Sequence, residues 1–495
     1  MSQLKKGAFY SYLYLGLTNI GGILVTPYVI RMLGNSEYGL YTLIGAFVGY
    51  LSILDLGLNN AIVRYVAQYK SQGDKKGQEN FLGTSLLIYS VIGIVIGCAG
   101  LVMYFNVENL FGDSLTNSEL SKAKIMLLIL VGNIAITLPG GAFMGICNGY
   151  ERFIFPRVLS IIKYVLRTIL IILILYKGAD ALGIVILDTL MNLFFILASM
   201  FYVFKVLKVK IKLHQFEWPF IKEIFGYSIW IFVFGLVYQF QWRTGQIILG
   251  ATTNTVTVAV YAVGVMLGVY YMTFGNVING LILPKAVKSV YNNASPKILT
   301  QEMIRVSRVT LILLTYIFGG FLLLGQDFVF LWVGSSFEAS WMVAVLIMAA
   351  YIIPISQGYA HAVLEAKKMM RFKAVSSLVL SAIGIITGGI LSHTYGISGM
   401  IYGIFGALIT LQFIVAVFYH KRIGINMFMY LKEALFPFFI LVTGVVGCAY
   451  WLLQLFAISW VLFVLKGTIY TFIFSVGLWF VLNEEEKKYI TNKIL

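Results

Sequence analysis

The sequence predicts an all-α polytopic membrane protein with about 14 transmembrane helices, arranged as two six-helix lobes followed by two C-terminal helices. Three observations lead to this fold class. Of the 495 residues, 60% are hydrophobic and only 11% are charged, whereas a soluble domain carries roughly 25% charged residues. Apolar runs of about 20 residues, each long enough to cross a ~30 Å hydrocarbon core, recur along the whole chain. The basic residues fall almost entirely in alternate loops.

The apolar runs divide the chain into predicted helices of similar length. Their centres lie near residues 20, 52, 92, 132, 165, 192, 236, 272, 313, 348, 382, 408, 442 and 471. Residues 1–6 lead straight into the first run, and they show no small-residue cleavage site of the signal-peptide kind. We therefore expect the first helix to be retained. No polar stretch between the runs is long enough for a separate soluble domain.

The loops explain the net charge of +16, which in a soluble protein would suggest a nucleic-acid partner. The term side one denotes the side of the membrane that holds the N-terminus, and side two denotes the opposite side. When loops alternate, side one holds 28 of the 36 basic residues, and side two holds four: Arg31, Lys122, Lys124 and Lys177. The positive-inside rule then makes side one the cytoplasm. Both termini are expected to be cytoplasmic, and no nucleic-acid partner is expected.

Two stretches of sequence recur at nearly one offset. The segment around Gly34 resembles the segment around Gly250, 216 positions later, and the segment around Arg152 resembles that around Arg371, 219 positions later. This repeat predicts a first lobe over residues 1–206, a cytoplasmic linker over 207–222, a second lobe over 223–422, and two further helices with a cytoplasmic tail over 423–495. Because six is even, both lobes enter the membrane in the same direction, as in transporters with parallel repeats.

Two segments also carry a family resemblance. Residues 26–41 (TPYVIRMLGNSEYGLY) and 54–65 (LDLGLNNAIVRY) resemble bacterial polysaccharide flippases of the multidrug/oligosaccharidyl-lipid/polysaccharide exporter superfamily, and residues 395–399 (YGISG) are similar too. The resemblance implies a flippase that moves an undecaprenyl-diphosphate-linked oligosaccharide to the outer leaflet by alternating access, for cell-surface polysaccharides such as O-antigen. It also implies the bacterial cytoplasmic (inner) membrane as the location. The expected partners are the lipid-linked oligosaccharide diphosphate, membrane lipids, and a polysaccharide polymerase or chain-length protein.

One position departs from the family pattern. Members often carry an aspartate before the Ile-Leu-Gly run at the end of the seventh helix. In this chain Gly245 stands at that position, and a cation, Arg243, lies two residues before it.

Six charged residues fall inside predicted helices rather than in loops: Lys163, Arg167, Arg243, Lys466, Asp55 and Asp188. A charge within a membrane span is costly, so it usually faces a partner or a water-filled cavity. Lys163 and Arg167 lie four residues apart and therefore share a helix face. Guanidinium groups bind phosphate oxygens in pairs, and lysine adds a point charge. We expect Lys163, Arg167 and Arg243 to line a cationic cleft for the diphosphate headgroup.

Two interpretations of Arg167 stay open, because an ion pair with Asp188 would make it structural rather than part of the binding site. Lys163 would remain uncompensated unless Asp55 reached it. Lys466 is expected to extend outward along its aliphatic stem to the membrane surface.

Further candidates lie in and near the first helices. Pro27 removes a backbone hydrogen bond and can kink the first helix, so Pro27 and Arg31 are a candidate gate. Arg64, Lys466 and Asn19 are weaker candidates for contacts with the headgroup. Several amides within the spans are interpreted either as hydrogen-bonding groups for sugar hydroxyls or as packing bonds between helices; they are Asn19, Asn133, Asn192, Gln239, Gln241, Asn276 and Asn279.

Other functions are weighed by what the sequence lacks. It has no Gly-x-x-x-x-Gly-Lys-Ser/Thr loop for a nucleotide and no His/Cys/Asp cluster with metal-ligand spacing, so no cofactor and no enzymatic activity are expected. An exporter of drugs or organic cations would need unpaired acids in its cleft, whereas the predicted helices contain four bases and two acids. A glycosyltransferase or polymerase would need catalytic groups in a substantial outer loop. The longest outer loop, about residues 106–124, has no histidine. Within the class of lipid-linked oligosaccharide flippases, a lipid II flippase is an alternative.

Overall fold

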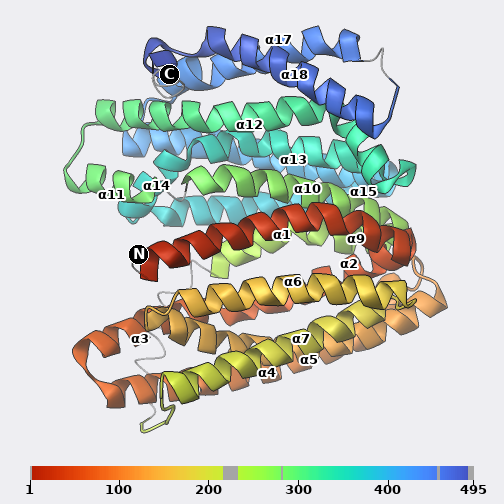
Figure 1. Ribbon diagram of the computed structural model, residues 1–495, viewed down its shortest axis with the longest axis vertical. Helices are drawn as coiled ribbons and strands as arrows, with labels where there is room; N and C mark the ends of the chain where they lie inside the picture. Colours follow the sequence, from red (N-terminus) through yellow and green to blue (C-terminus); the bar gives the residue numbers. More distant parts are fainter. Residues whose placement is uncertain (1–2, 216–231, 280–281, 454–456, 489–495) are drawn as a thin grey trace. The chain divides into compact units, whose positions relative to one another are not determined.

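A computed structural model describes residues 3–215, 232–279, 282–453 and 457–488 of the chain. These residues form helices, turns and loops, with no strand among them. They divide into two compact units, Met1–Ala259 and Val260–Leu495, which are described separately (Figure 1). Within the described ranges, 12 helical segments are long and apolar enough to cross a membrane. The chain is a multi-pass α-helical membrane protein, as the sequence predicts.

The predicted count of about 14 helices is consistent with these 12 segments. One of them, Met370–Ile423, contains two of the predicted helices, because α15 (Met370–Phe418) is interrupted at Gly396, where φ is 53°. The helix predicted near residue 236 lies partly outside the described residues. Residues 232–242 of it are helical, and α9 (Thr244–Thr252) follows.

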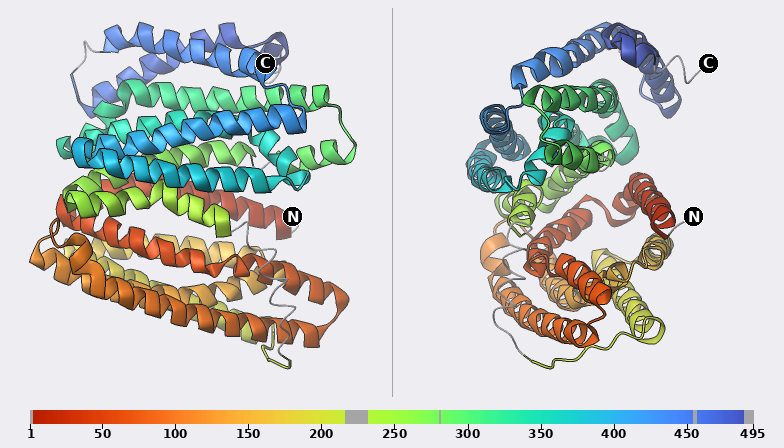
Figure 2. Two further views of the ribbon diagram at one scale, coloured as in Figure 1. Left: turned by 180° about the vertical axis from the view of Figure 1, so that it is seen from behind. Right: turned by 90° about the vertical axis from the view of Figure 1, so that its left-hand side faces the viewer.

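The first unit is a bundle of long helices that run back and forth. They are α1 (Gln3–Leu33), α2 (Asn35–Leu51), α3 (Leu58–Gln72), α4 (Lys75–Phe111), α5 (Asn117–Gly149), α6 (Ile154–Tyr176), α7 (Ala181–Phe201) and α9, with the start of α10 (Thr255–Asn279). Side chains that accept hydrogen bonds from the first turn begin several of them: Asp74 for α4, Thr116 for α5 and Asp180 for α7. Helix α1 packs on α6, as the right view of Figure 2 shows.

The helix predicted around residue 52 is two helices in the structure. Helix α2 ends at Leu51, a 3₁₀ turn follows over Ser52–Asp55, and α3 begins at Leu58. The chain breaks there because Leu56 and Gly57 both adopt left-handed conformations, with φ of 51° and 74°. Asp55 therefore lies at a helix break, not within a regular helix as predicted.

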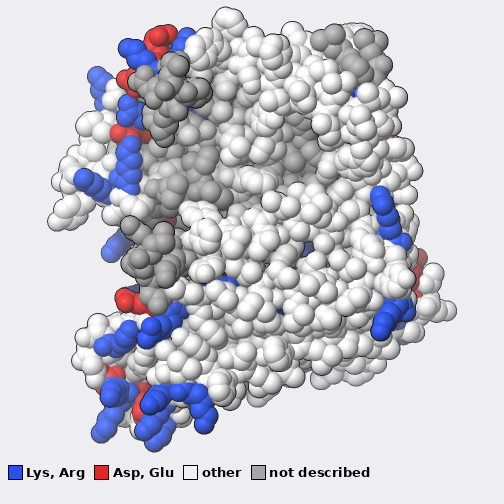
Figure 3. Space-filling model, viewed as in Figure 1, with Lys and Arg blue, Asp and Glu red and all other residues white. Residues whose placement is uncertain are grey.

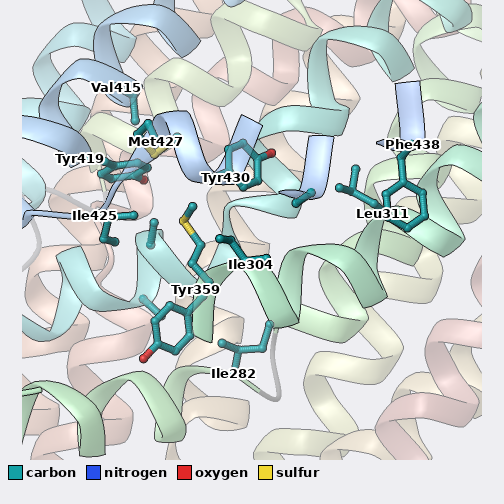
Figure 4. Close-up of a cluster of buried hydrophobic side chains, with 14 of the residues drawn as sticks. Ile282, Ile304, Leu311, Tyr359, Val415, Tyr419, Ile425, Met427, Tyr430 and Phe438 are labelled. Atoms are coloured by element: carbon teal, nitrogen blue, oxygen red, sulfur yellow. The ribbon is translucent and has the colours of Figure 1, made fainter. Parts of the chain in front are cut away.

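The second unit packs around one long helix. Its elements after α10 are α11 (Leu283–Tyr291), α12 (Pro296–Val333), α13 (Ala339–Ser356), α14 (Gly358–Ala366), α15, α16 (Met427–Tyr430), α17 (Phe436–Leu453) and α18 (Trp460–Val481). Helices α13, α14, α17 and α18 all contact α12. The core gathers apolar side chains from α12, α14, the end of α15 and α17, among them Leu311, Tyr359, Tyr419 and Phe438 (Figure 4).

Left-handed residues recur in both units at nearly one offset. The three pairs are Glu151 and Lys368, Gly178 and Gly396, and Lys208 and Gly424, at separations of 217, 218 and 216 positions. Residues other than glycine rarely adopt this conformation, so its recurrence at matching positions reflects the same turns in both units. The offsets agree with those of the sequence repeat. The predicted lobe boundaries at residues 206, 222 and 422 stay a prediction.

The ends of the matching helices repeat as well. Helix α7 is followed by a π-helical turn, Tyr202–Val206, and α15 by another, Tyr419–Ile423. Next to the first turn the rings of Phe155 and Tyr202 stack 3.8 Å apart, and next to the second those of Phe372 and Phe418 stack 4.2 Å apart. The repeat therefore extends from sequence to backbone and side-chain packing.

The charges of each unit are unevenly distributed along its helices. In Figure 3 the Lys and Arg side chains in view gather at one end of each unit's helices, and a smaller group lies at the other end of the first unit. Two of the four basic residues predicted for side two have acidic partners: Lys122 with Glu37 and Asp180, and Lys124 with Glu108. Neighbouring acids thus neutralise Lys122 and Lys124. The orientation expected from the loops stays a prediction.

The two halves of α15 meet through glycines, which gives a first prediction. A Cβ on Gly403 would overlap the backbone of Gly388, whereas a Cβ on Gly406 would meet nothing within 4 Å. We expect Gly403→Ala to lower the free energy of unfolding by about 1–3 kcal/mol, the usual cost of overpacking. Thermal unfolding in detergent measures it, with Gly406→Ala as the matched control. Equal unfolding temperatures for the two variants would contradict the close packing.

Candidate functional site

The first unit contains a cavity of about 270 Å³ among its helices. Its walls come from α1, α5, α6 and α7, and they include the aromatic rings of Tyr14 and Tyr164 and the small residues Gly140 and Gly141. Two of the predicted headgroup residues, Lys163 and Arg167, line this cavity, and so does Asn192. The cavity therefore combines cationic, amide and aromatic groups inside an apolar helix bundle.

Lys163 lies near the middle of α6 and is partly buried. Its ammonium donates a hydrogen bond to Oδ1 of Asn192 on α7. The amide of Asn192 in turn donates to Oδ1 of Asn133 on α5 at 2.9 Å, and Thr137 donates to the same oxygen at 3.0 Å. Among the described residues no carboxylate forms an ion pair with Lys163. Its positive charge is solvated by neutral amides and remains uncompensated.

Arg167 and Asp188 form the ion pair that the sequence left open. Nε and Nη2 of Arg167 lie 2.5 Å and 2.8 Å from the two oxygens of the Asp188 carboxylate on α7. The hydroxyl of Tyr41, on α2, lies 3.4 Å from both Nη2 of Arg167 and the carboxylate. Both charged side chains are only partly exposed, at 32% and 20%. The pair is bidentate and locally neutral, so of the two cations in the cavity only Lys163 offers free charge.

Asp55 does not reach Lys163. Its carboxylate accepts a hydrogen bond of 2.7 Å from the hydroxyl of Tyr89 on α4. That partner lies on another helix because the chain turns at the break after α2, which directs Asp55 toward α4. The alternative in which Asp55 compensates Lys163 is therefore wrong.

Arg243 lies apart from the residues that line the cavity. It directly precedes α9, without a capping hydrogen bond from its side chain, and lies beside Gly49 of α2, where a Cβ on the glycine would be 3.7 Å from its Nε. Next to it Gln239 donates to the carbonyl oxygen of Gly49 at 2.8 Å, and Tyr50 is hydrogen-bonded to Thr244. Arg243 thus belongs to the same unit as Lys163 but contacts other residues. A cleft shared by the three cations stays a prediction.

Lys466 does not extend to the membrane surface as predicted. Its ammonium lies 2.6 Å from a carboxylate oxygen of Asp327, and the lysine is 5% exposed. Asp327 was not among the acids placed inside predicted helices, because α12 continues to Val333, beyond the apolar run that predicted it. The partly buried acid on α12 holds the lysine of α18 inside the second unit. A contact of Lys466 with the headgroup stays a prediction.

The weaker candidates lie outside the cavity lining. Helix α1 continues through Pro27, and Arg31 is exposed in its last turn. Arg64 is exposed on α3 with its guanidinium 5.6 Å from the centre of the Tyr65 ring. Asn19 is buried within α1 at 7% exposure. A gate at Pro27 and Arg31, and substrate contacts of Arg64 and Asn19, stay predictions.

The side-two ends of α2, α5 and α7 are joined by a small ionic network. Lys122 of α5 lies against Glu37 of α2 and 2.8 Å from Asp180, which caps α7. Burial acts to raise the pKa of Asp180, but hydrogen bonds from Lys122 and from the N–H of Gly183 outweigh it and hold that pKa below its usual value. Asp180 therefore stays ionised at neutral pH. The network fixes the helix ends that lie beyond the cavity.

Several polar residues of the two units escaped the sequence analysis. Tyr41 gave no signal, because a tyrosine in an apolar helix is common. In the second unit, no sequence signal indicated a charged partner of His361, which lies in α14 with its Nδ1 3.1 Å from the ammonium of Lys373. That positive charge, together with burial, lowers the pKa of His361 to about 3. Within the described ranges, no group of three His, Cys, Asp or Glu residues could hold a metal ion.

The helix bundle and its polar cavity define a multi-pass α-helical membrane protein with charged groups inside its first unit. The structure resembles that of the lipid II flippase MurJ in an inward closed conformation, with a TM-score of 0.68 at 16% identity over 95% of this chain and 97% of that one. It also resembles an inward-facing multidrug resistance MATE transporter of the MOP superfamily, with a TM-score of 0.65 at 14% identity over 83% of this chain and 94% of that one. At these identities the similarity establishes the fold.

The sequence establishes the family. The model of the polysaccharide biosynthesis protein family matches residues 4–290, more than half of the chain. The chain therefore belongs to that family, and the predicted membership in the polysaccharide flippase branch is confirmed. No curated protein sequence matches the chain.

Proposed function

We propose that this protein is a flippase that moves a lipid-linked oligosaccharide diphosphate from the cytoplasmic to the outer leaflet of the bacterial cytoplasmic membrane. Family membership and the transporter fold support a role in the export of polysaccharide precursors. In this assignment both termini are cytoplasmic and the protein is a transporter, not an enzyme. Its partners are the lipid-linked substrate and, in polymer synthesis, the polymerase that consumes it.

The observation that carries the proposal is the uncompensated charge of Lys163 in the cavity of the first unit. A diphosphate is a strong ligand for an ammonium group in surroundings of low dielectric constant, where charge attraction is much stronger than in water. Lys163 exchanges its bond to Asn192 for a phosphate oxygen when the headgroup enters. Oδ1 of Asn192 is then free to accept a hydrogen bond from a sugar hydroxyl.

The remaining walls suit an oligosaccharide whose lipid tail stays in the bilayer. Tyr14 and Tyr164 offer aromatic rings, and Thr137 offers a hydroxyl that matches sugar hydroxyls. The polyprenyl tail stays in the bilayer beside the lipid-facing helices, so only the headgroup crosses within the protein.

The test is a flipping assay in proteoliposomes with a fluorescent undecaprenyl-diphosphate oligosaccharide. Lys163→Gln is expected to reduce flipping about 10- to 100-fold, because hydrogen bonds to charged groups contribute about 1.5–3 kcal/mol to the binding of the headgroup. Lys163→Arg is expected to restore part of the flipping. Lys177→Gln is the matched control, since Lys177 is an exposed cation at the end of the same helix. Wild-type flipping by a normally folded Lys163→Gln variant would refute the proposal.

Lipid II is a second candidate substrate, favoured by the fold shared with a lipid II flippase and by its diphosphate linkage, which the same lysine would bind. Competition between the two lipids in the flipping assay separates the candidates. An organic cation is disfavoured, because the free charge in the cavity is positive. We therefore expect no efflux of cationic dyes.

A further inference from the structure

A second cavity, of about 340 Å³, lies on α15 in the second unit, and we refer to it as the α15 groove. Its lining forms two rows of residues spaced four apart, so each row follows one face of the helix. One row is Phe413, Val417 and Lys421; the other is Ile414, Phe418 and Arg422. Each row reads apolar, apolar, cationic. The groove is therefore hydrophobic along its length and positively charged at one end.

The groove has a pair of stacked aromatic rings on one side and exposed apolar side chains on the other. Phe372, from the first turn of α15, stacks on Phe418 with their rings 4.2 Å apart and 9° from parallel. The two come together because α15 folds back at Gly396, which brings its first and last turns to the same end. Phe413 is 72% exposed and Val417 52%. In a membrane helix, such side chains face lipid.

The charged end of the groove is formed by two neighbouring cations. Lys421 and Arg422 are both exposed, and no ion pair among the described residues includes either of them. They lie in the π-helical turn that follows α15, where the chain leaves the apolar span. The charged end of the groove thus lies at the boundary between membrane and water, on side one.

We propose that the α15 groove binds one anionic phospholipid, with its phosphate on Lys421 and Arg422 and an acyl chain along Phe413 and Val417. Basic pockets of this kind at the cytoplasmic boundary of membrane helices bind acidic lipid headgroups. The proposal does not rest on the proposed flippase function, because Lys421 and Arg422 belong to the second unit and Lys163 to the first.

Two other occupants fit the groove less well. The lining side chains include no hydroxyl or amide, so the groove offers nothing to the sugars of a lipid-linked oligosaccharide. A second copy of the chain, docked by a two-fold axis, would bring the same patch of each copy together. Lys421 and Arg422 would then face like charges, which disfavours such a dimer.

The test is native mass spectrometry of the full chain in detergent, titrated with dioleoyl phosphatidylglycerol or dioleoyl phosphatidylcholine. We expect one phosphatidylglycerol to be retained and Lys421→Gln/Arg422→Gln to bind it about 30-fold more weakly, which corresponds to about 2 kcal/mol. Lys288→Gln/Lys297→Gln is the matched control: it removes the same charge from exposed side-one lysines that have no ion pair among the described residues. Retention of phosphatidylcholine should be the same for the wild type and both variants.

Four outcomes would overturn the proposal. They are equal phosphatidylglycerol retention by the wild type and the Lys421→Gln/Arg422→Gln variant, equal retention of the two lipids by the wild type, displacement of the lipid by glycerol phosphate alone, and a dimer in place of the lipid adduct. Displacement by undecaprenyl phosphate at equal concentration would reassign the groove to the polyprenyl substrate. Both variants alter exposed residues, and unchanged unfolding temperatures without added lipid exclude a folding defect.

Discussion

Replacing Lys466 by methionine is expected to destabilise the protein by about 3–5 kcal/mol, the usual cost of leaving one member of a buried ion pair without its partner. Lys466 is 5% exposed and lies 2.6 Å from Asp327. Methionine keeps most of the side-chain volume, so the loss measures the stranded carboxylate of Asp327 and not a cavity. Thermal and denaturant unfolding in detergent give the change.

The double variant Lys466→Met/Asp327→Leu tests the cause of that loss. Replacing a whole buried ion pair by apolar residues of similar size is often neutral or stabilising, so we expect the double variant to regain most of the stability. Lys432→Met, an exposed lysine with no ion pair among the described residues, serves as the control. A double variant as unstable as Lys466→Met would mean that the pair does more than neutralise itself.

The importance of this pair follows from where it lies. Arg308 of α12 is 6% exposed and binds Glu486, which follows α18, through two contacts of 2.7 Å. It also donates to the carbonyl oxygen of Glu433, which precedes α17. Lys466 and Asp327 join α18 to α12 further along. The C-terminal hairpin of α17 and α18 is therefore fastened to the second unit at two separate points, and the loss of either should loosen it.

The sequence predicted the helices and their charge pattern because both depend on local properties. Apolar runs and basic loops identify spans regardless of how the helices pack, and a spacing of four residues was enough to put Lys163 and Arg167 on one face. The break at Leu56 was missed because leucine gives no signal for a left-handed conformation. The apolar length of a run also underestimates the length of the helix. Helix α12 continues to Val333 and therefore includes Asp327, which lies beyond the apolar run.

The partners of the charged residues could not be predicted, since they are set by tertiary packing. Lys466 and Asp327 lie 139 positions apart, and nothing local links them. The ion pair of Arg167 with Asp188 was one of two interpretations, because helix depth alone brings the two residues to a similar level. Its geometry required the packing of α6 on α7.

Helices α6 and α7 are joined by two polar rungs, one helical turn apart. In the first rung, Lys163 of α6 binds Asn192 of α7. In the second rung, Arg167, four residues after Lys163, binds Asp188, four residues before Asn192. The rungs differ in charge, since the first holds a cation against a neutral amide and the second is an ion pair. Removing Arg167 would free the Asp188 carboxylate one turn from Lys163, where it could neutralise the ammonium.

We therefore expect Arg167→Met to reduce flipping about as strongly as Lys163→Gln, about 10- to 100-fold, even if the arginine itself makes no contact with the headgroup. The double variant Arg167→Met/Asp188→Leu removes the freed carboxylate and leaves Lys163 uncompensated, so it should recover most of the flipping and stability. Flipping in proteoliposomes and unfolding in detergent are measured together. If Arg167 bound the diphosphate directly, the double variant would be as inactive as Arg167→Met while folding normally. Recovery would identify the pair as the element that keeps Lys163 charged and available.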